Sequence, residues 1–161
     1  MPRLLIVWHS ATGGSAAMAR AAAEAAGEEC DVVSTRAVDA GPDDLLVADG
    51  YLFACPENLA SMAGLMKDFF DRSYYPVLGR IEGRPYAQMI CAGSDGEGAA
   101  RQLARIATGW RLKAVAEPLI VNVAAQTPEA ILATKTIAEP DLARCRDLGA
   151  TLAAGLAMGV F

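Results

Sequence analysis

The chain has a single histidine, His9, and its four cysteines form no Cys-x-x-Cys pair. The cysteines are widely spaced, at Cys30, Cys55, Cys91 and Cys145. This pattern disfavours a zinc site, so we expect no metal and four reduced thiols. Basic residues are also scarce, because 19 acids outnumber 14 lysines and arginines and leave a net charge of −5. Without a basic face to neutralise phosphates, nucleic acid is excluded as a partner.

Long apolar runs are absent as well. The run Leu4 to Trp8 ends at His9 and is too short for a signal peptide. The apolar stretch Leu148 to Phe161 is interrupted by glycines and is too short to cross a bilayer. We therefore expect no membrane span and a cytoplasmic location. With 161 residues, 53% of them hydrophobic and 20% charged, the chain is long enough to bury a core as one domain over 1–161.

Apolar runs alternate with helical stretches along this chain. Strands are predicted at residues 4–8, 31–38, 50–55, 85–92 and 113–123, with Pro56 ending the third. Helices are predicted at 16–26, 61–71, from the 92–98 loop to about 110, and 139–159, with short pieces near 45–48 and from 127. Ser61 is the expected N-cap of the second helix, and Ser94 with Glu97 has capping-box spacing. The alternation predicts an α/β three-layer sandwich, a five-stranded parallel sheet with helices on both faces.

Three small polar loops follow strands of this sheet, at residues 9–15, 56–61 and 92–98. Carboxyl ends of parallel strands are where ligands bind, so the three loops are expected to form one site. The first loop offers the hydroxyls of Ser10, Thr12 and Ser15 beside two glycines, at the N-terminus of a helix that favours an anion. It contains no lysine or arginine, which suits a phosphate monoester held by neutral donors.

Other interpretations of the first loop are less well supported. A nucleoside triphosphate loop would need a lysine after Gly14, and a dinucleotide fingerprint would need a third glycine at fixed spacing. A simple helix cap and turn is open on this loop alone. The other two loops favour a ligand site.

Taken together, the three loops resemble the flavodoxin-like FMN-binding family. The resemblance rests on Ser-x-Thr-Gly-x-Ser in the first loop, on Pro56 to Arg72 after the third strand, and on Ala92-Gly93-Ser94. It covers nearly the whole chain and is greatest to the NAD(P)H-dependent FMN and quinone reductases. It implies non-covalent FMN, with the phosphate in the first loop and the ring between the other two. The implied cofactor-binding residues are Ser10, Ala11, Thr12, Gly13, Gly14, Ser15, Pro56, Glu57, Asn58, Leu59, Ser61, Ala92, Gly93 and Ser94.

The second loop departs from the family pattern. Relatives commonly carry Thr-x-Phe/Tyr-Gly where this chain has Glu57-Asn58-Leu59-Ala60, which removes an aromatic contact and adds an acid. We hypothesise that Glu57, Asp95 and Glu97 lower the reduction potential of the flavin, with solvated loop acids as the alternative. Asp71-Arg72 also matches the family, but an ion pair at the end of the helix is the favoured role.

The resemblance implies an NAD(P)H-dependent oxidoreductase that passes hydride through FMN to a quinone or free flavin. FMN performs this chemistry, so no catalytic side chain is assigned, and His9 is expected to be structural. The alternative is a flavodoxin-type electron carrier, which the modest charge and the absence of aromatic residues from the second and third loops disfavour. A receiver domain of the same fold would need acids where Trp8-His9 and Cys55-Pro56 stand. Resemblance to the reductase group also implies a homodimer or homotetramer. The apolar last helix could supply the interface, but we expect it to cover the sheet.

Overall fold

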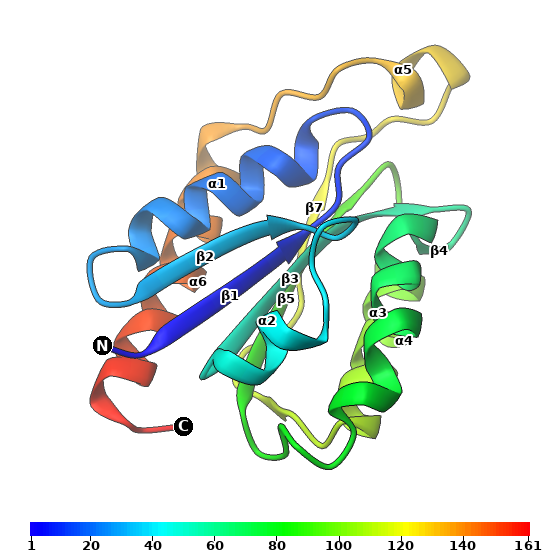
Figure 1. The fold of residues 1–161 in the computed structure, drawn as a ribbon. Coiled ribbons are helices and arrows are strands. Elements are labelled where there is room, and N and C mark those ends of the chain that lie inside the picture. Colours follow the sequence, from blue (N-terminus) through cyan, green and yellow to red (C-terminus); the bar gives the residue numbers. More distant parts are fainter.

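The computed structural model describes residues 1–161, which form a twisted sheet between two layers of helices (Figure 1). Neighbouring strands run in the order β2-β1-β3-β5-β6, and β7 continues the edge beside β5. All of these pairs are parallel, whereas β4 pairs antiparallel with β3. The strands are β1 (Arg3–Trp8), β2 (Asp31–Arg36), β3 (Gly50–Asn58), β4 (Ser61–Met62), β5 (Pro85–Ala92), β6 (Lys113–Ala114) and β7 (Leu119–Asn122).

Helices cover both faces of this sheet, as the strand and helix alternation predicts. Helices α1 and α6 pack together over one face, and α2, α3 and α4 cover the other (Figure 1). No helix is both long and apolar enough to cross a membrane. The helices are α1 (Gly14–Ala26), α2 (Pro42–Val47), α3 (Gly64–Val77), α4 (Glu97–Gly109), α5 (Pro128–Leu132) and α6 (Glu139–Met158).

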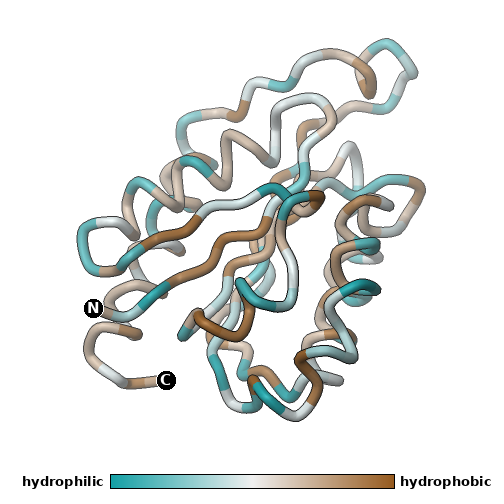
Figure 2. Tube along the Cα trace, in the orientation of Figure 1, coloured by the Kyte–Doolittle hydropathy of each residue, from teal (hydrophilic) through white to brown (hydrophobic).

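The central strands are apolar at successive positions because both of their faces are buried. Leu5 and Val7 of β1 contribute to the core under α2, α3 and α4, whereas Leu4 and Ile6 contribute to the core under α1 and α6. The continuous hydrophobic colour of β1 in Figure 2 reflects this double burial. A parallel sheet covered on both sides requires such strands, which is why the residue pattern predicts the three-layer sandwich.

The last helix covers the first helix rather than standing free. Leu152 is buried against α1 and the sheet, and Leu148 and Leu156 pack against the same core. Val160, beyond the end of α6, is exposed. The expectation that this helix covers the sheet layer is confirmed for most of its apolar residues.

Several predicted boundaries are wrong, most of them after the third strand. Pro56 does not end β3, which continues to Asn58. Pairing with β1 ends at Ala54, so no β1 residue lies opposite Pro56 and the N–H that proline lacks is not needed there. Ser61 begins β4 instead of capping a helix, and α3 begins at Gly64 and ends at Val77, beyond Asp71. The predicted strand 113–123 is divided into β6 and β7, with Pro118 in the interruption.

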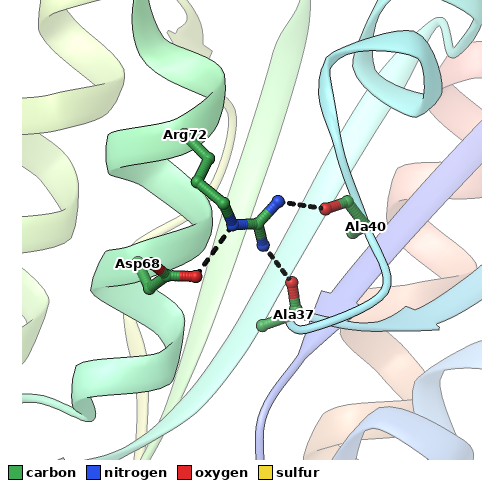
Figure 3. Close-up of polar contacts among 4 residues, drawn as sticks. All are labelled: Ala37, Ala40, Asp68 and Arg72. Atoms are coloured by element: carbon green, nitrogen blue, oxygen red, sulfur yellow. Dashed lines mark hydrogen bonds and ion pairs between the residues drawn. The ribbon is translucent and has the colours of Figure 1, made fainter.

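Arg72 of α3 ties the loop after β2 to the helix layer. Its guanidinium donates to the carbonyl oxygens of Ala37 (2.8 Å) and Ala40 (3.0 Å) and pairs with Asp68 (2.8 Å), as Figure 3 shows. Asp71 instead pairs with Lys67. Asp71 and Arg72 therefore form separate ion pairs within α3, and only Arg72 also connects distant segments.

We predict that Arg72→Met lowers the free energy of unfolding by about 1–2 kcal/mol, because two carbonyls of buried alanines lose a charged donor. Lys67→Met is the matched control, since it removes only an exposed ion pair of the same helix and is expected to cost less than about 0.5 kcal/mol. Urea denaturation at pH 7 measures both values. Equal losses of unfolding free energy in the two variants would show that the hydrogen bonds from Arg72 to Ala37 and Ala40 do not stabilise the fold.

Candidate functional site

The three predicted loops meet at the carboxyl ends of β1, β3 and β5, around a cavity of about 430 Å³. This volume lies within the range of small-molecule and cofactor sites. Residues between 123 and 135, which follow β7, form the remaining wall. The lining residues are Thr12, Pro56, Glu57, Asn58, Leu59, Ala60, Cys91, Ala92, Gly93, Ser94, Val123, Ala125, Ile131 and Lys135.

The first loop leaves the N-terminus of α1 open. Gly13 occupies the position before the helix with φ 99°, and no side chain caps the first turn. The N–H groups of Gly14, Ser15 and Ala16 have no backbone acceptor. Ser15 is 98% buried, and its hydroxyl has no hydrogen-bond partner. These groups form a set of donors with no acceptor from the chain, which is the arrangement that binds an anion.

The N-terminus of α4, in contrast, is already occupied by a side chain. The carboxylate of Glu57 accepts hydrogen bonds from the backbone N–H groups of Gly96 (2.8 Å) and Ala99 (3.0 Å). The predicted capping box of Ser94 and Glu97 is wrong, because Glu97 is the first residue of α4. The helix is capped instead by Glu57 of β3. Glu57 thereby fastens the second loop to the third.

Close backbone packing supports this contact. A side chain at Gly98 would overlap the carbonyl oxygen of Ala60, so the second loop approaches α4 where α4 carries no side chain. The Gln102 side chain of α4 accepts hydrogen bonds from the Ser61 hydroxyl (3.0 Å) and the Met62 N–H (2.8 Å). The hairpin of β3 and β4 is therefore held against α4 along its length.

The tip of this hairpin has an unusual conformation for its residues. Leu59 and Ala60 connect the paired residues Asn58 and Ser61, with φ of 51° and 63°. A two-residue hairpin turn of type I′ needs positive φ at both positions, which Asn and Gly adopt more easily. Leu59 is fully exposed at the cavity rim. A leucine with a left-handed backbone conformation therefore lies at the mouth of the cavity.

Eight of the residues singled out from the sequence line the cavity, and the other six do not. Those at the cavity are Thr12, Pro56, Glu57, Asn58, Leu59, Ala92, Gly93 and Ser94. Ser10 accepts a hydrogen bond from the Gly13 N–H, and Ser61 is directed to Gln102. Of the three acids expected near the flavin, only Glu57 lines the cavity. Burial lowers the pKa of His9, which lies outside the lining and donates its backbone N–H to Ala54.

Sequence reasoning missed several lining residues beyond β7. Val123 and Ala125 follow the carboxyl end of β7, so the rule that identified the other loops also applies to them. Lys135 has no comparable signal in the sequence. It is brought to the first loop by a hydrogen bond from its N–H to the carbonyl oxygen of Thr12, at 2.8 Å.

The four cysteines are free, buried thiols. Burial raises the pKa of Cys55 to about 12 and that of Cys145 to about 11. It also raises the pKa of Cys91, although the charge of Lys135 opposes this rise. The Cys91 sulfur lies in the cavity wall close to Gly14, where burial disfavours its thiolate form.

Sequence comparison identifies two kinds of relative. Residues 26–128 match the family model of NADPH-dependent FMN reductases. A curated protein, a flavodoxin of Aquifex aeolicus (strain VF5), is 32% identical over 100 residues, which is 61% of this chain and 52% of that protein. The match therefore spans about half the length of this curated relative.

Solved structures share the fold at low sequence identity. A flavodoxin from the domain Archaea superposes with a TM-score of 0.77 at 19% identity, covering 96% of this chain and 98% of that one. A WrbA-like flavodoxin from Agrobacterium tumefaciens gives a TM-score of 0.71 at 20% identity, covering 98% and 99%. Rubredoxin oxygen:oxidoreductase from Desulfovibrio gigas gives 0.80 at 16% identity, covering 98% of this chain but 37% of that one.

We predict that Glu57→Ala lowers the free energy of unfolding by about 1–2 kcal/mol, because two N–H groups at the start of α4 lose a charged acceptor. The amide protons of Gly96 and Ala99 should exchange faster with solvent in this variant. Glu97→Ala is the matched control, because this exposed glutamate accepts no hydrogen bond and contributes only through the helix dipole. Unchanged exchange at both amides in Glu57→Ala would show that Glu57 does not cap α4.

Proposed function

The chain belongs to the NADPH-dependent FMN reductase family, and on this premise we propose that it is an NAD(P)H-dependent oxidoreductase acting through bound FMN. The observation that carries the proposal is the cavity enclosed by the three loops, with an open helix N-terminus beside it. FMN has one anionic phosphate and one flat ring, and the site offers one cluster of free donors and one loop-bounded cavity.

The residues present fit this cofactor at its phosphate end. The buried, unpartnered hydroxyl of Ser15 and the free N–H groups of the first turn of α1 are suited to a phosphate monoester. Thr12 adds a hydroxyl at the cavity wall. Gly14 lets the start of α1 pack closely against the cavity wall, because a side chain there would collide with the Cys91 sulfur. In the proposal Ser10, Ala11 and Gly13 complete this loop.

The ring would lie between the second and third loops. Backbone groups at Glu57 to Leu59 and at Ala92 to Ser94 border the cavity there. Because Glu57 holds these loops together through α4, it would keep their spacing fixed. When bound, FMN supplies the hydride-accepting ring, so the chain's own residues need only bind it, orient it and limit the access of water.

The cavity favours a reductase over an electron carrier. None of its lining residues is aromatic, so no side-chain ring would cover the flavin and its face would be accessible to a nicotinamide. The accepting substrate we propose is a quinone or free flavin entering the same cavity in turn. An electron carrier is the second candidate, because the curated relative is a flavodoxin.

A cytoplasmic location and a homodimer or homotetramer remain part of the proposal, and four free thiols suit a reducing compartment.

An anaerobic titration of the FMN-loaded protein with NADPH, and then with NADH, tests this function. We expect the visible flavin absorbance to bleach as one equivalent of nucleotide is oxidised, at a rate well above that of free FMN under the same conditions. Free FMN is the control for reduction without protein. A bound flavin that is reduced by dithionite but by neither nucleotide would contradict the reductase and favour the carrier.

A further inference from the structure

Lys135 lies across the first loop although 123 residues separate it from Thr12. Its backbone N–H donates to the Thr12 carbonyl oxygen at 2.8 Å, and its Nζ lies 3.3 Å from the Thr12 hydroxyl oxygen. The segment between α5 and α6 is thus fixed against the start of α1. A side chain at Gly14 would lie 3.5 Å from the Lys135 Cβ, so Lys135 is also close to the helix N-terminus.

The ammonium group of Lys135 has no acidic partner. Its other hydrogen bonds go to the carbonyl oxygens of Ile131 (2.8 Å) and Ala133 (2.6 Å), which hold it in place without neutralising it. None of the ion pairs of the chain includes this lysine. It is also the only cationic residue in the cavity lining. A fixed, uncompensated positive charge beside free N–H donors is a strong attraction for an anion.

The surrounding groups favour the same kind of ligand. Ser15 has a buried hydroxyl with no partner, and the first turn of α1 has no cap. The loop 9–15 itself has no lysine or arginine, so any cation at this end of the cavity must come from elsewhere in the chain. Lys135 and the loop 9–15 both lie outside the residues 26–128 that match the family model.

We propose that the ammonium group of Lys135 supplies the positive charge beside the flavin phosphate and makes the site select phosphorylated flavin over riboflavin. This proposal rests on the proposed function, because it assumes that FMN occupies the cavity. The phosphate would accept from the N–H groups of α1 and from the Thr12 and Ser15 hydroxyls, and Lys135 would contribute the positive charge that the loop lacks. The lysine would then fix the position of the cofactor and take no part in hydride transfer.

Flavin fluorescence titrations test this assignment. They measure the affinity of the apoprotein for FMN and for riboflavin at two salt concentrations. We expect Lys135→Gln to weaken FMN about ten-fold and to leave riboflavin unchanged, because only FMN carries the phosphate. The salt dependence of FMN affinity should also become shallower in this variant. Lys113→Gln is the matched control, since Lys113 is exposed at the opposite end of β5 and should affect neither ligand.

Three results would overturn the assignment. Unchanged FMN affinity in Lys135→Gln would show that the lysine does not bind the phosphate, while leaving the proposed function intact. An equal loss for FMN and riboflavin would show that Lys135 only ties its segment to the first loop. A wild-type chain that binds neither flavin would overturn the proposed function and the role of Lys135 with it.

Discussion

The contact on which the site depends is the one between the Glu57 carboxylate and the N-terminus of α4. It satisfies the N-terminus of α4 with the chain's own negative charge. The N-terminus of α1 is left with free donors and a buried hydroxyl. Because helix N-termini attract anions, the phosphate of the proposed cofactor would bind at α1, and its uncharged ring would occupy the space between the other loops.

The sheet determines where this division can occur. Parallel strands β1, β3 and β5 end at the same edge, so their loops lie together although they are far apart in the sequence (Figure 1). The two helical layers bury both faces of the sheet and keep this edge rigid. The segment after β7 then closes the open side and carries Lys135 to the start of α1. Rigid strands position the loops, and the loops determine the chemistry.

The fold and the three loops could be predicted because they depend on local patterns. Apolar runs such as Leu4 to Trp8 indicate strands buried on both faces of the sheet, and the small polar residues after them indicate a turn. The contacts between loops could not be predicted. Leu59-Ala60 forms a hairpin turn without the usual Asn-Gly signal, so the sequence pattern predicts a helix start where β4 lies. Glu57 and Lys135 act across 39 to 42 and 123 residues, where sequence spacing carries no information.

In the proposed complex, residues from all of these segments form one flavin site. Amide hydrogen exchange of the protein with and without FMN tests it most directly, because it reports which backbone N–H groups become protected. We predict slower exchange in 10–16, 57–61, 92–96 and 134–136 together, with β2 at the far edge unchanged. Binding of FMN that protects other parts of the chain and leaves the first turn of α1 unaffected would contradict it.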